Sequence, residues 1–314
     1  MTKICLAVSG LAAWLAVPAA AHADSYQYEI DVAYDADRAS TEATFESPFL
    51  NLGISSETDN DELGITGTWY FHAVGTPAGP LSRAAFIDRA SGLSLSYSRG
   101  DGDSVFTVTG DGTVVAPGVT RSGQTTNAFS ASLRWVWRES GWYGLGGLSR
   151  AELELAGSKT SADGYSLGFG KYLGAQTTLD LTLLRSDSDA QGAFIGGDST
   201  STEAALGFSH IGSVGGSWQY GTDIVLATTP RGPSDGSYSA RVSLYPSRLL
   251  AFGIDVDGAL RDASDASTSY GLFASWFVRE RIELDARYGW LSFDESENTD
   301  ADQYSFGVGV KFRF

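Results

Sequence analysis

The chemistry open to this chain is limited by its few nucleophiles and general bases. Its 314 residues include three histidines, His22, His72 and His210, and a single cysteine, Cys5. Acid–base and nucleophilic catalysis usually need a histidine held beside the group that it activates. Neither His72 nor His210 lies in a serine or aspartate pattern of that kind. The sequence therefore predicts that the protein is not an enzyme. Because His72 and His210 are far apart in the sequence, no transition-metal site is expected either.

Most of the charge comes from carboxylates. Asp and Glu number 38 against 21 Lys and Arg, which gives a net charge of −17 at pH 7. This balance disfavours a nucleic-acid partner, which would select a basic surface. The acidic residues are interpreted as solvated loops, with divalent-cation bridging to an anionic membrane surface as the alternative. Asp101 and Asp103 lack the full spacing of a calcium loop, so their Asp-Gly pairs predict turns and no cofactor is expected.

The first 23 residues have the pattern of a signal peptide. A cationic start at Lys3 precedes an apolar run over residues 4–20, and Ala21-His-Ala23 resembles a cleavage site. Cleavage between Ala23 and Asp24 would leave residues 24–314 as a single domain. It would also remove the only cysteine and the only methionine, so the mature chain would have neither disulfides nor thiol chemistry.

The final eleven residues alternate strictly between two kinds of side chain. Tyr304, Phe306, Val308, Val310, Phe312 and Phe314 share one face of a strand, and the other face carries Ser305, Gly307, Gly309, Lys311 and Arg313. This stretch resembles the terminal strand of Gram-negative outer-membrane β-barrels. The resemblance implies that Phe314 is the signal read by the barrel assembly machinery. It also implies outer-membrane lipids and lipopolysaccharide as partners.

The rest of the mature chain repeats the same alternation. Segments 127–138, 165–173, 178–186, 203–210, 217–227, 236–246, 249–260, 268–278 and 281–293 each set apolar residues opposite small or charged ones. No apolar run after Ala23 approaches the ~18 residues of a membrane-spanning helix. In lipid, only helices and closed barrels satisfy every backbone polar group. The fold prediction is an all-β, transmembrane, antiparallel up-and-down β-barrel of the porin type.

Aromatic residues gather near one set of connections. They include Trp69-Tyr70-Phe71, Trp135, Trp137, Trp142-Tyr143, Tyr172, Tyr245, Trp276-Phe277, Phe312 and Phe314. Trp and Tyr collect at membrane interfaces because their rings are amphipathic. We interpret the group as one interfacial aromatic girdle.

The connections alternate between short turns and longer acidic loops. Short turns are expected at 139–141, 174–175, 212–213, 246–247 and 279–281, and long loops at 56–61, 157–163, 187–202, 229–235, 261–267 and 294–302. Short periplasmic turns opposite long external loops are typical of bacterial barrels and place the C-terminus in the periplasm. We expect 14 strands, with either 26–34 or 49–56 outside the barrel. Sixteen is the alternative, using both plus 105–115.

Residues 79–90 interrupt this strand rhythm. The segment begins after Gly79 and Pro80 and predicts a short helix. It resembles a Gly-Pro-Leu-x-x-Ala-Ala-Phe stretch of porins from Gram-negative bacteria. With 14 strands it would lie in the periplasmic mouth, and with 16 it would lie outside or fold into the lumen as a constriction.

Charged residues on the inward faces are the candidates for a pore lining. They are Arg134, Arg138, Arg150, Glu152, Glu154, Asp180, Asp223, Arg241, Asp255, Asp257, Glu283, Asp285, Arg287, Lys311 and Arg313. The cations near the short turns form either a headgroup anchor or an anion-attracting vestibule. Asp255, Asp257, Glu283 and Asp285 form either salt bridges that stabilise the wall or the acidic half of a constriction.

A barrel this wide can hold water, so the expected function is passive diffusion of small hydrophilic solutes and ions through an outer-membrane porin. The alternative is a non-conducting barrel with a structural or adhesive role through its acidic loops. The sequence leaves open whether three barrels associate.

Overall fold

The computed structural model describes residues 25–47, 50–76, 79–110, 118–155, 158–191, 199–228, 236–260, 267–293 and 299–314. The predicted signal peptide and its cleavage site at Ala23 and Asp24 lie outside the described residues. The strands are β1 (Ser25–Ser47), β2 (Leu50–Gly75), β3 (Gly92–Gly110), β4 (Gly118–Trp137), β5 (Trp142–Leu155), β6 (Ser158–Tyr172), β7 (Thr177–Gln191), β8 (Ser199–Gly215), β9 (Trp218–Thr228), β10 (Gly236–Ser247), β11 (Leu250–Leu260), β12 (Ser267–Arg279), β13 (Ile282–Phe293) and β14 (Thr299–Arg313).

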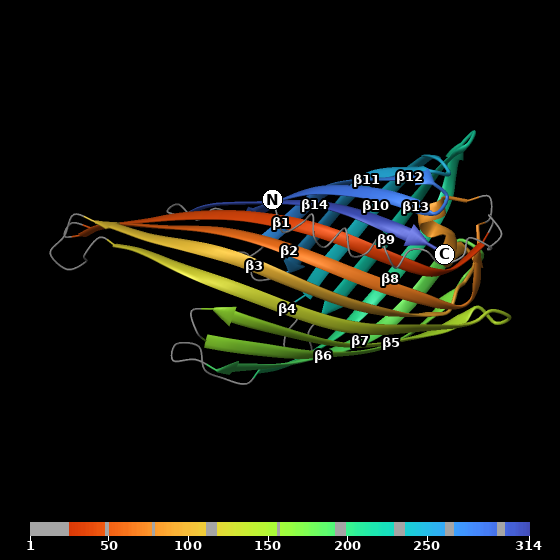
Figure 1. Cartoon of the computed structure of the whole chain (residues 1–314), viewed down its shortest axis with the longest axis horizontal. Coiled ribbons are helices and arrows are strands. Elements are labelled where there is room, and N and C mark those ends of the chain that lie inside the picture. The colour runs from red at the N-terminus through yellow and green to blue at the C-terminus, as the bar shows by residue number, and fades with distance from the viewer. Residues whose placement is uncertain are drawn as a thin grey trace.

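These strands form one closed antiparallel barrel (Figure 1). Each strand pairs with the next along the chain, and β1 closes the barrel against β14 from Glu29 opposite Arg313 to Ala43 opposite Thr299. The backbone of Phe314 completes this seam, because its N–H donates to the carbonyl of Tyr28 at 2.9 Å. Closure leaves no open sheet edge along the seam. The predictions of an all-β up-and-down barrel and of 14 strands are therefore confirmed.

The N-terminal strands reach this count differently from the prediction. Either 26–34 or 49–56 was expected outside the barrel, but 26–34 belongs to β1 and residues 50–56 to β2. The predicted hairpin of 49–56 with 62–74 is also wrong, because residues 50–75, including the predicted loop at 56–61, form one strand that pairs with β1 and β3. Likewise 93–99 and 105–110 are both parts of β3. Strand pairing continues beyond the apolar part of each strand, because backbone N–H and C=O groups need hydrogen-bond partners whatever side chains they carry. Strands β1 to β4 accordingly extend past the others at one end (Figure 1).

The outward face is a band of exposed apolar side chains. Leu167 is 71% exposed, and Leu148, Leu181 and Ile254 are at least half exposed. A soluble domain could not leave so continuous a surface in water, whereas a barrel presents it to lipid. The band identifies the outward face of every strand, because side chains alternate between the two faces.

Aromatic residues border the apolar band at both ends, where the sequence predicted one girdle. Near the turn between β4 and β5 lie Trp69, Trp135, Trp137, Trp142 and Trp276. At the other border of the apolar band, where the outward face becomes polar, lie Tyr97, Phe129, Tyr165, Trp290 and Tyr304. Four residues predicted in the girdle, Tyr143, Tyr172, Tyr245 and Phe277, are instead buried and only 2%, 4%, 3% and 2% exposed. They point inward because their strand positions have inward parity.

The end that holds the turns between β4 and β5 and between β6 and β7 also holds the C-terminus; we call it the short-turn end. There the connection from β2 to β3 contains a 3₁₀ turn, Leu81–Arg83, and a short helix, α2 (Ala84–Ile87). We call residues 79–90 the plug segment, because it lies within the barrel mouth beside the C-terminus (Figure 1). No helix in the described ranges is long and apolar enough to cross a membrane.

Candidate functional site: the barrel lumen

The inward face of the wall is polar. Strand parity places these predicted residues on it: Arg134, Asp180, Asp223, Arg241, Asp255, Asp257, Glu283, Asp285, Arg287, Lys311 and Arg313. Arg138 lies in the turn after β4 and pairs with Asp88 of the plug segment at 3.3 Å. The predicted set is therefore mostly gathered around one enclosed space.

Three predicted residues are on the other side of the wall. Arg150, Glu152 and Glu154 share parity with Leu148, which is 58% exposed on the lipid face. Arg150 also lies directly opposite Phe129, another exposed outward residue. Their assignment to the lumen was wrong, because β5 continues beyond the apolar band and can carry charges on its outward face there.

Most lumen charges belong to the half of the wall formed by β9 to β14 and β1. Arg241 pairs with Asp255 at 3.4 Å, and Arg287 pairs with Asp35 at 2.7 Å. The carboxylates outnumber the cations in this half; they are Glu29, Asp31, Asp35, Asp37, Asp223, Asp255, Asp257, Glu283 and Asp285, against Arg241, Arg287, Lys311 and Arg313. This half of the lumen therefore has an excess of negative charge.

The half formed by β2 to β8 carries mainly hydroxyl groups. Thr66 donates to Ser96 at 3.0 Å, and the hydroxyls of Thr68 and Ser94 are 2.8 Å apart. The row of small polar side chains continues through β4 to β8 and lines a hollow of about 380 Å³ with Ser130, Ser132, Ser149, Ser166, Ser186 and Ser201. A solute crossing the lumen would thus face hydrogen-bonding groups on one side and a charged wall on the other.

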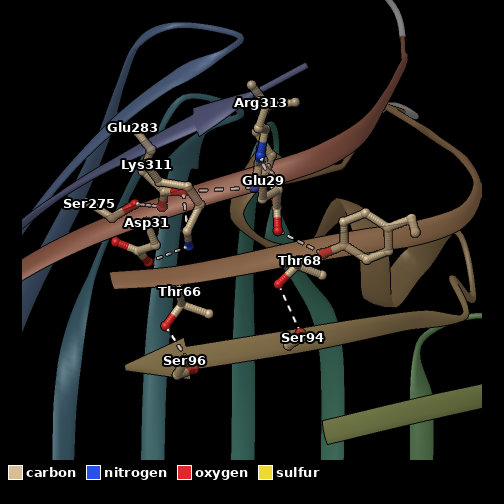
Figure 2. Close-up of polar contacts among 12 residues, drawn as sticks. Glu29, Asp31, Thr66, Thr68, Ser94, Ser96, Ser275, Glu283, Lys311 and Arg313 are labelled. Carbon is tan, nitrogen blue, oxygen red and sulfur yellow. Dashed lines mark hydrogen bonds and ion pairs between the residues drawn. The ribbon is translucent and has the colours of Figure 1, made fainter. Parts of the chain in front are cut away.

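Two cations at the short-turn end, Lys311 and Arg313, are neutralised by carboxylates. On β14, Lys311 is 3.5 Å from Asp31 and 3.6 Å from Glu283, and it lies between these two residues in the strand register. Arg313 binds Glu29 at 2.7 Å and is only 4% exposed. Figure 2 shows Lys311 and Arg313 directed toward the carboxylates of β1 and β13. These two residues therefore contribute no unpaired charge to the predicted anion-attracting vestibule.

The same network holds the plug segment in place. Arg313 donates to the carbonyl of Leu81 at 3.0 Å, so the last residues of the barrel fix the start of the plug segment. Arg83 crosses to Asp223 of β9 at 2.7 Å. On the far side, the hydroxyl of Tyr172 donates to the carbonyl of Phe86 at 2.9 Å. These contacts connect the segment to β14, β9 and β6, so it spans the mouth.

Apolar packing adds to these polar contacts. Leu81 and Ala84 are 0% and 1% exposed, and Ala84 packs in a cluster with Tyr26 and Val74. The guanidinium of Arg89 lies 4.8 Å from the ring centre of Tyr172, a favourable cation–π distance. The plug segment is thus a packed part of the fold and narrows the short-turn end.

Glycines let several lumen side chains lie flat on the wall. A side chain at Gly271 would collide with the Asp255 carboxylate, and one at Gly309 would come within 2.7 Å of the Asp285 carboxylate. At Gly307 a Cβ would meet both Asp35 and Arg287, which it would approach to 2.8 Å at Nε. These side chains lie along the wall and occupy less of the lumen than extended ones would.

The sequence prediction missed Glu29, Asp31 and Asp35 of β1 as lumen residues. The sequence contains the alternation that identifies them, because Tyr28, Ile30, Val32 and Tyr34 form the opposite, apolar face of the strand. It also missed the inward turn of Tyr26, which follows from an irregularity in the pairing of β1 with β2 between Tyr26 and Tyr28. No group of three or more His, Cys, Asp or Glu side chains able to hold a metal ion occurs in the described ranges.

A closed barrel with an apolar band and a polar lumen is the architecture of transmembrane β-barrels, and a solved outer-membrane protein has the same fold. The outer membrane protein Omp33 of Acinetobacter baumannii matches with a TM-score of 0.53 and 15% identity, over 93% of this chain and 100% of that one. At this identity the match shows the fold alone.

Other solved barrels are more distant. The transport unit of the autotransporter AIDA-I from Escherichia coli has a TM-score of 0.42 and 10% identity, over 96% of this chain and 94% of that one. OprB of Pseudomonas putida has a TM-score of 0.38 and 7% identity, over 91% and 93%. These scores carry no argument about this chain. No protein-family model and no curated protein matches it.

Proposed function

We propose that this protein is an outer-membrane channel for passive diffusion of small hydrophilic solutes and ions. The observation that carries the proposal is the polar inward face of a closed 14-strand barrel. A barrel of this strand number is wide enough to leave space between opposite walls. Charged side chains on those walls need water or partners, because burial of an unpaired ion is costly. A hydrated lumen meets that need.

Orientation and location follow from the two ends of the barrel. Short turns and the C-terminus face the periplasm, and the extended strands β1 to β4 face the cell exterior, as is usual for bacterial barrels. The signal peptide predicted over residues 1–23 and the aromatic Phe314 support export and assembly into the outer membrane of a Gram-negative bacterium.

The plug segment sets the resistance of the proposed channel. It spans the periplasmic mouth and is held by Arg313, Asp223 and Tyr172. Solutes pass through whatever space it leaves, and any displacement of the segment widens the path. We therefore expect a low conductance for the intact protein.

Planar-bilayer recording tests this function. Purified, folded protein should give discrete conductance steps, and a variant with residues 79–90 replaced by a short Gly-Ser linker should give larger ones. Folding is checked by β-sheet circular dichroism and by the heat-dependent gel mobility of each protein. If neither the intact protein nor the linker variant gave conductance steps although both were folded, the proposed channel function would be overturned.

The second candidate is a non-conducting barrel with a structural or adhesive role. The burial of Leu81, Ala84 and Arg313 at the plugged end specifically favours it, because a permanently packed segment closes the path. Absence of conductance from both the intact and the linker protein, with cell-surface binding by the intact protein, would support this candidate.

A further inference from the structure

The charged wall contains one row in which apolar side chains also face the lumen. In the strand register, Val225 of β9 is opposite Ser239 of β10, which is opposite Asp257 of β11. The row continues through Ser269 of β12 to Leu291 of β13. Directly opposite residues lie on the same face of a sheet, and Asp257 is an inward residue, so all five face the lumen. A carboxylate therefore lies at the centre of the row, with a serine on each side and an apolar residue at each end.

These five residues line a hollow of about 390 Å³ in the wall, together with Ser237 and Ala259; we call it the Asp257 hollow. Val225 is 42% exposed, although it faces the lumen. The interior of an outer-membrane barrel is usually polar, and apolar surface in contact with water is unfavourable. Val225 and Leu291 thus offer an area of contact that the apolar part of a solute would remove from water.

The carboxylate in this row is available to a ligand. Among the described residues, the Asp257 carboxylate takes part in no ion pair, and the residue is exposed. Arg241, one inward position nearer the short-turn end, lies 3.4 Å from Asp255 instead. The hydroxyl of Ser269 lies 3.5 Å from the backbone carbonyl oxygen of Asp257, so it is directed at the backbone and not at the carboxylate.

The spacing of the row indicates the size and chemistry of the ligand. Neighbouring strands lie about 4.8 Å apart, so Val225 and Leu291 are each roughly 10 Å from Asp257 along the row. A protonated amine at the carboxylate can therefore place a group of about the size of a benzene ring over a serine and against either apolar residue. Hydrogen bonds between an ammonium group and a carboxylate are stronger than those between neutral groups. An inorganic cation gains the contact with the carboxylate alone.

We propose that the Asp257 hollow binds small organic cations, which combine a protonated amine with an apolar group. This inference deepens the proposed function and rests on it, because solutes reach the hollow through an open lumen. Asp223, which holds the plug segment through Arg83, precedes Val225 by two residues on β9. A bound cation therefore lies next to the plug segment on its exterior side, where it is retained before passage.

Isothermal titration of 2-phenylethylammonium into the purified protein tests this site, in non-ionic detergent micelles at pH 7 and 0.1 M salt. The same titration into micelles without protein is subtracted. Two further probes separate the contributions: 2-phenylethanol keeps the ring and lacks the charge, and ethylammonium keeps the charge and lacks the ring. Each should bind at least about tenfold less tightly than 2-phenylethylammonium, because it loses either the charged hydrogen bond or the apolar contact.

Three variants assign the binding to the hollow. Asp257→Asn should weaken the binding of 2-phenylethylammonium roughly tenfold or more. Val225→Thr with Leu291→Thr should weaken it roughly fivefold and leave ethylammonium binding unchanged. The matched control Asp285→Asn removes one carboxylate from the same wall, six residues from Leu291 along β13 or about 20 Å. It should weaken binding by less than about twofold, because that distance exceeds the Debye length of ~10 Å at 0.1 M salt.

Several results would overturn the inference. Equal affinity for 2-phenylethylammonium and 2-phenylethanol, or for the wild type and Asp257→Asn, would remove the carboxylate from the site. An equal loss in Asp285→Asn would assign the binding to the overall charge of the lumen. The comparison of probes uses the wild type, so it gives an answer even where a variant fails to fold. Because the titration measures no current, binding without conductance would overturn only the channel, and conductance without binding would overturn only this site.

Discussion

Gly307 occupies the middle of an ion pair that crosses the barrel seam. In the register of β14 it lies between Asp35 of β1 and Arg287 of β13. The absence of a side chain at Gly307 allows the carboxylate and guanidinium to meet at 2.7 Å over the backbone of β14. The pair thereby links two strands that do not hydrogen-bond to each other.

Replacement of Gly307 by valine should separate this pair and push both side chains into the lumen. We expect a smaller single-channel conductance and a stability loss of about 1–3 kcal/mol, as for an overpacked site. The matched control is Gly67→Val, because a Cβ at Gly67 meets nothing within 4 Å on the outward face. Equal conductance of the two variants in planar bilayers would show that the glycine at 307 does not shape the lumen.

Arg313 has a different role, because its charge is buried. Its Nε lies 2.7 Å from Glu29, and its guanidinium carbon lies 4.6 Å from the ring centre of Phe277. Removal of one partner from a buried pair leaves the other charge without compensation. Arg313 is therefore expected to stabilise the closed seam and the plugged mouth together.

Arg313→Met should lower the free energy of unfolding by about 3–5 kcal/mol, as for other broken buried pairs. Arg287→Met, which breaks a pair whose arginine is 59% exposed, should cost less than about 1 kcal/mol. Urea unfolding in detergent, followed by tryptophan fluorescence, compares the two. Similar losses for both would mean that burial does not decide the strength of these pairs.

Side-chain direction could be predicted from the sequence where an apolar face was intact. Asp255 and Glu283 alternate with lipid-facing residues, so the two-residue period placed them inward. The predicted direction of Arg150 and Glu152 was wrong, because a charged side chain was assumed to face the lumen. Beyond the apolar band both faces meet water, and there only parity with Leu148 gives the correct side.

At the level of elements, the sequence predicted the strand count but not the strand lengths. Apolar alternation ends near Leu63 in β2, whereas the strand continues back to Leu50 through backbone pairing with β1 and β3. The helical turn in residues 79–90 was expected from Gly79 and Pro80. Its anchors on distant strands could not be predicted, because Arg83 and Asp223 are 140 residues apart.

Weakening of those anchors should widen the channel without removal of the plug segment. Arg83→Gln breaks the 2.7 Å pair with Asp223, which is the contact of the segment with β9. We expect more frequent or larger openings in bilayer recordings, because the segment then loses its side-chain contact with β9 while Arg313 and Tyr172 still hold it. Asp223→Asn should give the same result, whereas Arg287→Gln, which breaks the lumen pair with Asp35 instead, should leave the opening frequency unchanged. If Arg287→Gln changed the openings as much as Arg83→Gln, lumen charge and not the anchor would be responsible.

The whole barrel has two unlike walls, and this asymmetry belongs to no single strand. Hydroxyl groups of β2 to β8 face the charged wall of β9 to β14 and β1 across the lumen. Since carboxylates exceed cations on the charged wall, the local potential is negative and concentrates cations in the lumen. The wall of β2 to β8 carries few charges, among them Arg134 and Asp180, so the more numerous carboxylates of the charged wall set the ion preference.

The channel should therefore prefer cations over anions, and the preference should depend on Asp255 and Asp257. With a tenfold salt gradient across a planar bilayer, the reversal potential of the wild type should have the sign of cation selectivity. Asp255→Asn with Asp257→Asn should move it toward zero, because two inward carboxylates of β11 lose their charge. The matched pair Asp101→Asn with Asp103→Asn removes equal charge from the outward face of β3 and should leave it unchanged. The shift should be larger at low ionic strength, because the Debye length falls from ~30 Å at 0.01 M to ~10 Å at 0.1 M salt. If both double variants shifted the reversal potential equally, the selectivity would come from the overall charge of the protein and not from the lumen wall.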